Sequence, residues 1–339
     1  MKAYIDDIEY FVPNNKLSNA DLSVMNPDWN VDRIFDKTGI NNRYISNKNQ
    51  TATDLAVEAG KILLEKNKDL KDVVDYIILC TQSSDYYLPS SACLIQEQLG
   101  LKQTIGAIDV NQGCSGFVYS LGLAKGLIET GQAKNILIIT SDTYSKYIND
   151  KDKSVKTLFG DAAACILVKA MEEAKHEFIG NPVYGTNGEG AKNLIVPDGG
   201  ARSPITTKSY HEEKDDSNNI RNQANLFMNG REIYTFTLST IPIVFNEILE
   251  KEKMVLDDVD VVIFHQANKL ILNSLQKKLK IPENKMHRSY MEYGNTVSST
   301  IPIGLKKEML KKYDNSEYKT ALLLGFGVGL SWAGNIIKY

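Results

Sequence analysis

A cysteine between a strand-like and a helix-like segment is the first candidate for chemistry in this chain of 339 residues. Cys114 follows the apolar run 105–110, and Gly113 and Gly116 allow the backbone to turn sharply around it. Apolar residues then recur at helical spacing up to Gly131, which places the cysteine at the start of a helix. The free backbone N–H groups of a helix start favour a thiolate. Cys114 is therefore predicted to be a nucleophile, and a packed, inert thiol is the open alternative.

The other three cysteines have settings that are typical of packed side chains. Cys80 and Cys165 lie within apolar, strand-like runs, and Cys93 lies in a helix-like segment, so all three are predicted to be structural. The chain has no Cys-x-x-Cys pair, and its four histidines lack metal-ligand spacing. These patterns predict neither a zinc site nor a disulfide framework, and free thiols fit a reducing compartment.

Three further motifs contain residue types that can assist a nucleophilic cysteine. His265 directly follows the strand-like run 259–264, from whose end a side chain can point into a cleft. Asn295 lies in a turn sequence after Gly294, and residues 325–334 are rich in glycine, which lets backbone N–H groups approach a ligand. Each motif has an ordinary structural alternative: a core or surface histidine, a turn or helix-capping asparagine, and a plain glycine turn.

Composition limits the classes of protein that this chain can belong to. Apolar residues make up 42% of the chain, charged residues 24%, and the net charge is −3. These values describe an ordinary globular protein and exclude a global attraction to nucleic acid or to anionic membranes. Acidic residues stand near the N-terminus where a signal peptide needs an apolar segment, and no run approaches the roughly eighteen apolar residues of a membrane span. A cytoplasmic location is expected.

The elements that must position these residues alternate between apolar, strand-like runs and longer amphipathic stretches. Residues 76–80 and 136–140 are examples of predicted buried strands, and the alternation predicts an α/β fold with helices packed on a buried sheet. Residues 185–222 are rich in loop formers and are predicted to be a surface excursion. The second half repeats the outline of the first. This pattern predicts a half that carries the cysteine, residues 1–171, and a half that carries the histidine and asparagine, residues 172–339.

The four motifs together, in this order and at these separations, resemble the thiolase superfamily over essentially the whole chain. The resemblance is specifically to the β-ketoacyl-acyl-carrier-protein synthase III group, and residues 38–40, 89–93 and 159–162 contain further landmarks of it. It implies a duplicated five-layer αβαβα fold of the thiolase type and a homodimer. It also implies that the Cys-His-Asn triad of that group corresponds to Cys114, His265 and Asn295.

The chemistry implied by the resemblance is a decarboxylative Claisen condensation. An acyl thioester loads Cys114, and the backbone N–H groups of Cys114 and Val328 stabilise the oxyanion. Malonyl-acyl-carrier protein then loses carbon dioxide, His265 and Asn295 donate hydrogen bonds to the enolate oxygen, and the carbanion attacks the acyl group to give a 3-oxoacyl product. No metal or other cofactor is needed.

Related enzymes differ in the residues that the chemistry requires. Elongating synthases use a second histidine where this chain has Asn295, and degradative thiolases need a cysteine near the C-terminus, whereas the last one here is Cys165. Hydroxymethylglutaryl synthases need a glutamate in a region that offers only Asp85. Two alternatives stay open. One is transfer of the acyl group to an oxygen, nitrogen or different carbon nucleophile, and the other is a non-catalytic carrier-binding or dimerisation partner.

Positions that bind the acyl donor in the resembling group depart from its usual pattern. Arg33 stands where a tryptophan is usual, Lys37 and Lys153 replace arginines, and Arg231 replaces an asparagine. The loss of an aromatic platform weakens adenine recognition, so an acyl-carrier donor is possible beside acyl-coenzyme A. Leu88 stands where a partner subunit often supplies a phenylalanine, which favours a longer or branched acyl group. The substrate-binding residues implied in full are Arg33, Lys37, Leu88, Lys153, Gly230, Arg231 and Asn268.

A lysine-rich segment is the candidate docking surface for the carrier protein. Residues 269–280 carry one apolar stripe and leave Lys269, Lys277 and Lys278 largely outward. An acidic carrier helix could bind there. A solvated face without a partner is the alternative interpretation.

Overall fold

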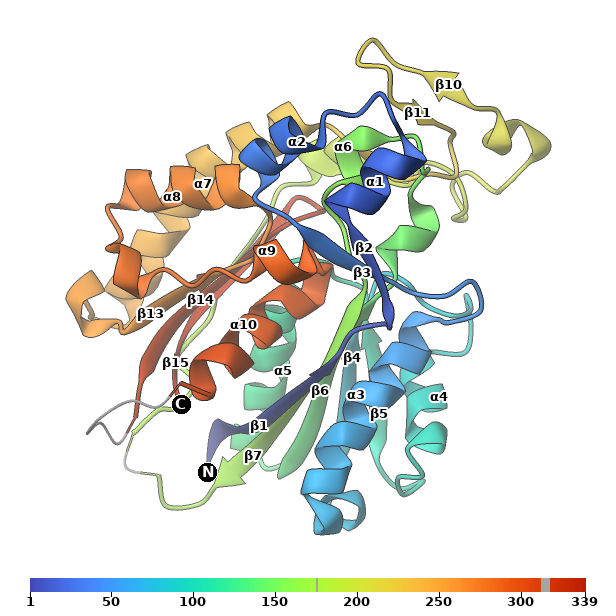
Figure 1. Cartoon of the computed structure of the whole chain (residues 1–339). Helices are drawn as coiled ribbons and strands as arrows, with labels where there is room; N and C mark the ends of the chain where they lie inside the picture. Colours follow the sequence, from blue (N-terminus) through green and yellow to red (C-terminus); the bar gives the residue numbers. More distant parts are fainter. Residues whose placement is uncertain (175, 312–317) are drawn as a thin grey trace.

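The first sheet of the protein contains five strands in the order β1-β7-β6-β4-β5. The computed structural model describes residues 1–174, 176–311 and 318–339, and Figure 1 shows its layers. Strand β4 is parallel to β5 and β6, whereas β7 is antiparallel to β6 and β1. The strands are β1 (Lys2–Phe11), β4 (Tyr76–Cys80), β5 (Gly106–Val110), β6 (Asn135–Asp142) and β7 (Ala162–Met171).

The second sheet contains four strands in the order β13-β14-β15-β8. Strand β13 is parallel to β14, and the remaining neighbours are antiparallel. These strands are β8 (Val183–Thr186), β13 (Val261–Phe264), β14 (Thr320–Gly327) and β15 (Ser331–Lys338). Every strand of the first sheet ends by Met171 and every strand of the second begins after it, so the predicted boundary between residues 1–171 and 172–339 falls between the two sheets.

Helices form three layers around and between the two sheets (Figure 1). The middle layer contains α5 (Gly116–Glu129) and α10 (Thr300–Met309), which contact strands of both sheets. The first sheet is covered on its outer face by α3 (Ala52–Lys66) and α4 (Ser91–Gln98). On the second sheet lies α7 (Gly230–Lys251), with α8 (Lys269–Leu279) packed against it. The predicted five-layer αβαβα fold is confirmed.

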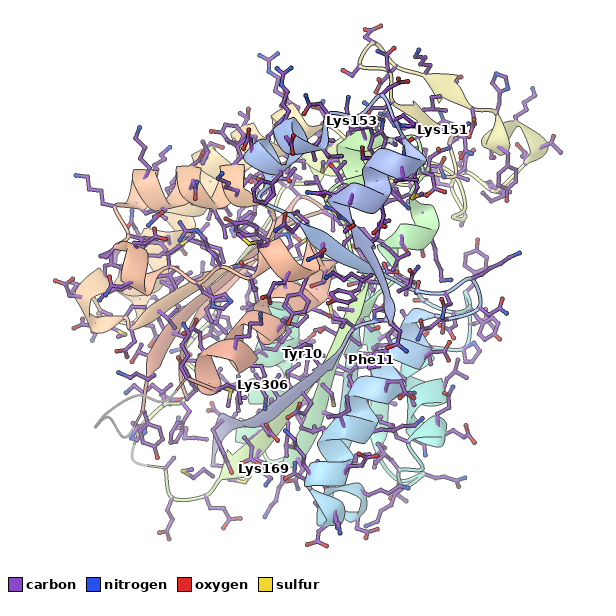
Figure 2. All side chains as sticks on the ribbon, viewed as in Figure 1. Tyr10, Phe11, Lys151, Lys153, Lys169 and Lys306 are labelled. Atoms are coloured by element: carbon purple, nitrogen blue, oxygen red, sulfur yellow. The ribbon has the colours of Figure 1, made fainter. Side chains whose placement is uncertain are left out.

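The middle helix α5 is buried because it is apolar on more than one face. Phe117, Val118, Leu121 and Ala124 are all fully buried, as expected for a helix that packs between two sheets. Its partner α10 carries one buried cation, Lys306 (Figure 2). The Lys306 ammonium group lies 3.0 Å from an Asp7 carboxylate oxygen and 2.9 Å from one of Glu9, so the charge is paired with β1.

The predicted surface excursion contains several short elements rather than one loop. Its hairpin, β10 (Glu213–Lys214) and β11 (Ile220–Arg221), projects from the body in Figure 1. Arg221 anchors it, because its Nε donates to Asp152 and its Nη2 donates to Asp215, each at 2.6 Å. The charged run 211–216 within the excursion is mostly exposed.

Smaller elements complete the chain. The remaining helices are α1 (Asn19–Met25), α2 (Val31–Thr38), α6 (Lys153–Lys156) and α9 (Tyr290–Tyr293), and the remaining strands are β2 (Asn15–Ser18), β3 (Asn42–Ile45), β9 (Leu194–Ile195) and β12 (Phe227–Met228). The 3₁₀ helices are η1 (Lys68–Asp72), η2 (Tyr144–Tyr147), η3 (Gly188–Asn193), η4 (Thr207–Tyr210), η5 (Leu256–Asp258), η6 (Glu283–Lys285) and η7 (Val297–Ser299). Among the residues described, no helix is both long and apolar enough to span a bilayer.

The cysteines that were predicted to be structural differ in burial. Cys80 in β4 and Cys165 in β7 are fully buried, as predicted. The prediction of a packed side chain is wrong for Cys93, which is exposed in α4 with its sulfur 3.2 Å from the Ser90 hydroxyl oxygen. Residues 91–98 do form a helix, but Cys93 lies on its outer face because Ala92 and Ile95 take the buried positions.

Candidate active site

The Cys114 thiol lies at the start of α5, as the sequence predicts. Strand β5 ends at Val110, and the chain turns before the helix begins at Gly116. The Gly116 N–H donates to the Gly113 carbonyl at 2.8 Å, which closes this turn. Cys114 is only 4% exposed, so the thiol faces the interior rather than bulk water.

The end of strand β14 approaches Cys114 so closely that a side chain on it would meet the cysteine. A Cβ atom on Gly327 would lie 3.0 Å from the Cys114 sulfur, and one on Gly325 would lie 2.5 Å from the Cys114 carbonyl oxygen. Glycine is thus required sterically at position 325, and a side chain at position 327 would crowd the sulfur. Ser115 and Ser331 link the two segments, with hydroxyl oxygens 2.8 Å apart. The Ser331 hydroxyl also donates to the Val328 carbonyl at 2.8 Å, which holds the Val328 peptide in place.

Several opposing effects act on the Cys114 thiol. Burial raises its pKa, and the nearby Asp142 carboxylate raises the pKa further. The backbone N–H groups of Cys114 and Val328 lower it, because both donate toward the sulfur. The N–H groups therefore favour the thiolate, as predicted, but burial outweighs them and the net pKa is raised. The same two N–H groups are positioned for a second task, since they can bind an oxyanion next to the sulfur.

His265 follows β13 directly and is held by both its backbone and its ring. Its N–H donates to the Leu324 carbonyl at 3.0 Å, and its ring meets the Phe326 ring edge-on at a centroid distance of 5.7 Å. The Nδ1 atom lies 2.8 Å from the Thr300 hydroxyl oxygen. Burial lowers the pKa of His265 to about 3, so the imidazole is neutral near pH 7.

Asn295 lies beside Phe159 in a short parallel bridge between distant segments. Its N–H donates to the Leu158 carbonyl at 2.9 Å, and its carbonyl accepts from the Gly160 N–H at 3.0 Å. The side-chain Oδ1 accepts from the Val297 N–H at 3.0 Å. With the oxygen occupied, the amide NH₂ group is the part of Asn295 that is available to a substrate.

Asp142 is a buried acid at the site that the sequence analysis missed. It ends β6, and its two carboxylate oxygens accept from the Gln82 N–H at 2.8 Å and from the Ser298 N–H at 3.2 Å. The Ser298 hydroxyl also donates to it. Burial raises the pKa of Asp142 to about 7. No sequence motif marks this residue, but it joins β6 to the segment that carries Asn295.

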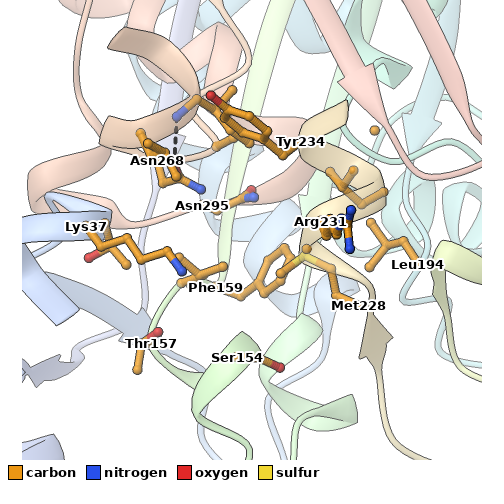
Figure 3. A pocket seen from close by; sticks show the side chains of 18 of the residues that line it. Lys37, Ser154, Thr157, Phe159, Leu194, Met228, Arg231, Tyr234, Asn268 and Asn295 are labelled. Atoms are coloured by element: carbon orange, nitrogen blue, oxygen red, sulfur yellow. Dashed lines mark hydrogen bonds between the residues drawn. The ribbon is translucent and has the colours of Figure 1, made fainter. Parts of the chain in front are cut away.

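Cys114, His265 and Asn295 line one cavity of about 640 Å³. Figure 3 shows this cavity, into which Lys37 extends from α2. Of the predicted substrate-binding residues, Lys37, Lys153, Gly230, Arg231 and Asn268 line it, whereas Arg33 and Leu88 do not. Lining residues that the sequence analysis missed include Ser154, Thr157, Leu158, Leu194, Met228, Ile233, Tyr234 and Phe326.

Two family models match this chain. The model for 3-oxoacyl-[acyl-carrier-protein] synthase III matches residues 108–188, and the model for its C-terminal domain matches residues 249–339. A β-ketoacyl-[acyl-carrier-protein] synthase III from Fusobacterium nucleatum is 35% identical over 99% of this chain and 98% of its own length. This chain belongs to the 3-oxoacyl-[acyl-carrier-protein] synthase III family.

Solved structures of the synthase III family have the same fold. A crystal structure of a 3-oxoacyl-(acyl-carrier-protein) synthase III superposes with a TM-score of 0.97 at 44% identity, covering 100% of both chains. A 3-oxoacyl-(acyl-carrier protein) synthase from Burkholderia xenovorans LB400 superposes with a TM-score of 0.91 at 32% identity, covering 100% of this chain and 94% of the other. The fold is therefore thiolase-like, and the protein is a condensing acyltransferase of the synthase III type.

The mouth of the synthase III cavity is rich in cations. Within the described parts of the chain, the side chains of Lys37, Lys153 and Arg231 have no hydrogen-bond or ion-pair partner. A second hollow of about 250 Å³ adjoins the cavity between α2 and α8, and Lys37, Leu270 and Lys277 are among its lining residues. The hollow shares Lys37 and Leu270 with the cavity that contains the thiol.

The three predicted docking lysines have different surroundings. Lys269 and Lys277 line the second hollow. Lys278 lies on the same helix, but its ammonium group donates to the Leu238 carbonyl of α7 at 2.7 Å. Asn268 caps α8 through its side chain, which accepts from the Ile271 N–H at 3.0 Å (dashed line in Figure 3). Among the described residues, no group of three or more His, Cys, Asp or Glu side chains is arranged to hold a metal ion.

Proposed function

We propose that Cys114, His265 and Asn295 perform a decarboxylative Claisen condensation between an acyl thioester and malonyl-acyl-carrier protein. One observation supports this proposal more strongly than any other. A buried thiol lies next to two backbone N–H groups, and a neutral imidazole and a free amide NH₂ group line the same cavity. This set provides one nucleophile, one oxyanion site and two neutral donors, which are the groups that the two half-reactions need.

In the first half-reaction the Cys114 sulfur attacks the carbonyl carbon of the acyl donor. The backbone N–H groups of Cys114 and Val328 bind the oxyanion of the tetrahedral intermediate. The bond from the carbonyl carbon to the donor sulfur then breaks, and the donor leaves as a thiol that takes up the proton lost by Cys114. Since the pKa of Cys114 is raised in the resting site, this proton transfer accompanies attack rather than preceding it.

In the second half-reaction malonyl-acyl-carrier protein enters and loses carbon dioxide. The bonding electrons move onto the thioester oxygen, where His265 and Asn295 donate hydrogen bonds to the enolate. The α-carbon attacks the acyl group, and the Cys114 thiolate leaves and is protonated by water. The reaction uses neutral donors throughout, and no cofactor is needed.

The cationic mouth is the proposed binding region for the donor. The free side chains of Lys37, Lys153 and Arg231 can bind the phosphate of coenzyme A or of a carrier-linked phosphopantetheine arm. Gly230 leaves room for that arm, because a Cβ atom there would meet nothing within 4 Å. Asn268 can contact the arm along its length, and exposed Arg33 remains a proposed contact outside the cavity.

The proposed docking surface for the carrier protein consists of Lys269, Lys277 and Lys278 on α8. The phosphopantetheine arm of the carrier protein must reach Cys114, and the adjoining hollow is the proposed path. The lysines at this hollow form a positive surface that is complementary to an acidic carrier helix. Lys278 contributes less, because its ammonium group is already bound to Leu238.

We also propose a cytoplasmic homodimer. Strand β5 is an edge strand with unpaired backbone groups on one side, and its Ile108 is 37% exposed. Close in sequence, Tyr87 and Leu88 are 89% and 82% exposed, which is unusual for large apolar side chains. A second copy that pairs along β5 would cover them. Leu88 would then limit the acyl end of the partner's cavity, and a leucine there favours a longer or branched acyl group.

Intact-protein mass spectrometry with a panel of acyl donors tests this function. The wild-type chain should gain one acyl group and release carbon dioxide when malonyl-acyl-carrier protein is added. Cys114→Ala should abolish the adduct, whereas Cys93→Ala is the matched control because it removes an exposed thiol outside the cavity. An adduct that survives in Cys114→Ala would contradict the proposal. Transfer without release of carbon dioxide would favour a different acceptor nucleophile, and no adduct at all would favour a non-catalytic role.

The same experiment ranks the acyl donors. Longer or branched acyl thioesters are expected to load Cys114 faster than acetyl-coenzyme A. A clear preference for acetyl-coenzyme A would reject the proposed role of Leu88.

A further inference from the structure

The hydroxyl group of Thr300 lies between two acceptors at the base of the His265 ring. Its oxygen is 2.8 Å from Nδ1 of His265 and 3.1 Å from the Val297 carbonyl oxygen. His265 and Thr300 are each 2% exposed, so bulk water does not compete for these groups. A hydroxyl group has a single hydrogen, and it can serve only one of the two acceptors at a time.

The position of that hydrogen determines which nitrogen of the imidazole is protonated. A neutral imidazole has one N–H group, so a ring that donates from Nε2 must accept at Nδ1. If the Thr300 hydroxyl donates to Nδ1, the ring proton resides on Nε2. If the hydroxyl turns to Val297 instead, Nδ1 carries the proton and Nε2 presents only a lone pair. The Val297 carbonyl is the competing acceptor, and a hydrogen bond from the ring to it acts to raise the pKa of His265.

We infer that Thr300 is a positioning residue that selects the Nε2–H tautomer of His265. The inference rests on the proposed function, in which His265 donates a hydrogen bond to the enolate oxygen during decarboxylation. The Phe326 ring packs against the imidazole at an interplanar angle of 89° and helps to hold it. Thr300 begins α10, and that buried helix fixes its position.

The contact has different consequences for the two half-reactions. Loading of Cys114 depends on the backbone N–H groups beside the sulfur, which Thr300 does not touch. Decarboxylation depends on a donor at Nε2. A loss of the Thr300 hydroxyl should therefore slow decarboxylation and leave acyl loading unchanged, whereas a general structural role would affect both.

The first test measures the tautomer directly. Nitrogen-15 NMR of histidine-labelled protein distinguishes the two ring tautomers, and a His265→Gln sample assigns the signal. Wild-type His265 should be protonated at Nε2, and Thr300→Val, which is close in shape but lacks the hydroxyl, should shift protonation to Nδ1 next to the Val297 carbonyl. A wild-type spectrum with the proton on Nδ1 would overturn the inference without any variant having to fold.

The second test separates the inference from the proposed function. Thr300→Val should reduce release of carbon dioxide from malonyl-acyl-carrier protein by about 10- to 100-fold, since a wrong tautomer removes a catalytic hydrogen bond. Thr300→Ser retains the hydroxyl and should restore both the Nε2–H signal and the rate. Equal decarboxylation rates in wild type and Thr300→Val would overturn the inference. Unchanged decarboxylation in His265→Ala would instead contradict the proposed function, because it removes the ring altogether.

Discussion

The side-chain oxygen of Asn295 accepts a hydrogen bond from the Val297 N–H at 3.0 Å. An N–H group can only donate, so this contact assigns the oxygen and leaves the amide NH₂ group for the cavity. The carbonyl of Val297 in turn lies 3.1 Å from the Thr300 hydroxyl beside His265. Val297 has a φ of 53°, a left-handed conformation that is unfavourable for a β-branched residue. One strained residue thus organises the surroundings of both proposed donors.

Replacing Asn295 with aspartate should affect only one half-reaction. Asn295→Asp keeps the oxygen that accepts from Val297, but it removes the NH₂ donor and adds negative charge near the developing enolate. Release of carbon dioxide should fall by about 10²- to 10³-fold, the usual effect of removing one oxyanion donor. Mass spectrometry should still detect the acyl adduct on Cys114. Equal losses in loading and decarboxylation would instead indicate a general disruption of the site.

Adding a methyl group at Gly327 should block the thiol. Its Cβ would lie 3.0 Å from the Cys114 sulfur, so Gly327→Ala should lower the rate of acyl loading at least 10-fold by crowding the attack on the carbonyl. Gly126→Ala is the matched control, because nothing lies within 4 Å of that Cβ. The control should load normally and be more stable by about 0.5–1 kcal/mol, since alanine is favoured over glycine in a helix. Normal acyl loading by Gly327→Ala would show that the close contact between the end of β14 and Cys114 does not constrain the sulfur.

Stability should depend on pH through His265. Its pKa falls from 6.5 to about 3 on folding, so between these values the unfolded chain binds more protons than the folded one. The contribution of His265 to the free energy of unfolding is therefore greatest above pH 6.5 and decreases as the pH falls toward 3. Asp142 shifts the other way, from 3.8 to about 7, and its contribution decreases as the pH rises through that range.

Urea denaturation of wild type and His265→Gln isolates the histidine contribution. Lowering the pH from about 7 to about 5 should reduce the unfolding free energy of wild type relative to that of His265→Gln. The reason is that only wild type must keep a buried imidazole neutral. A difference that stays constant over this range would mean that folding does not lower the pKa of His265.

Charge reversal on α8 should weaken the use of the carrier protein without harming the chemistry. Lys277→Glu should raise the KM for malonyl-acyl-carrier protein several-fold, and the effect should shrink as salt is added. Hydrolysis of a small thioester should not change. Lys68→Glu is the matched control, because this exposed lysine follows the end of α3 and lies away from α8. Equal KM values for Lys277→Glu and Lys68→Glu would reject the docking role of α8.

The local sequence was sufficient to predict the elements around each reactive residue. Apolar runs predict β4 and β13 because a strand buried on both faces is apolar throughout, and periodic apolar residues predict α8 over its full length. The glycine-rich segment 325–334 predicts that its backbone comes close to another group. In the structure that group is Cys114, which lies next to Gly327. These features depend on neighbours in the chain, so they can be inferred from the chain itself.

Contacts between residues that are distant in sequence could not be predicted from local sequence patterns. Asp142 has no motif, because its role depends on Gln82 and Ser298, which are distant in sequence. The burial that raises the pKa of Cys114 could not be predicted from the sequence either, since it depends on how the second half covers the first.

The sequence by itself determined the local elements and, by resemblance, the family, and it predicted which residues react. Only the tertiary structure decided the surroundings of those residues: a neutral His265 next to Thr300, an oriented Asn295, and free cations at the mouth of the cavity. The physical reason is that residue types and periodicity are properties of a segment. Desolvation and the direction of a hydrogen bond depend instead on atoms that folding brings together from both halves of the chain.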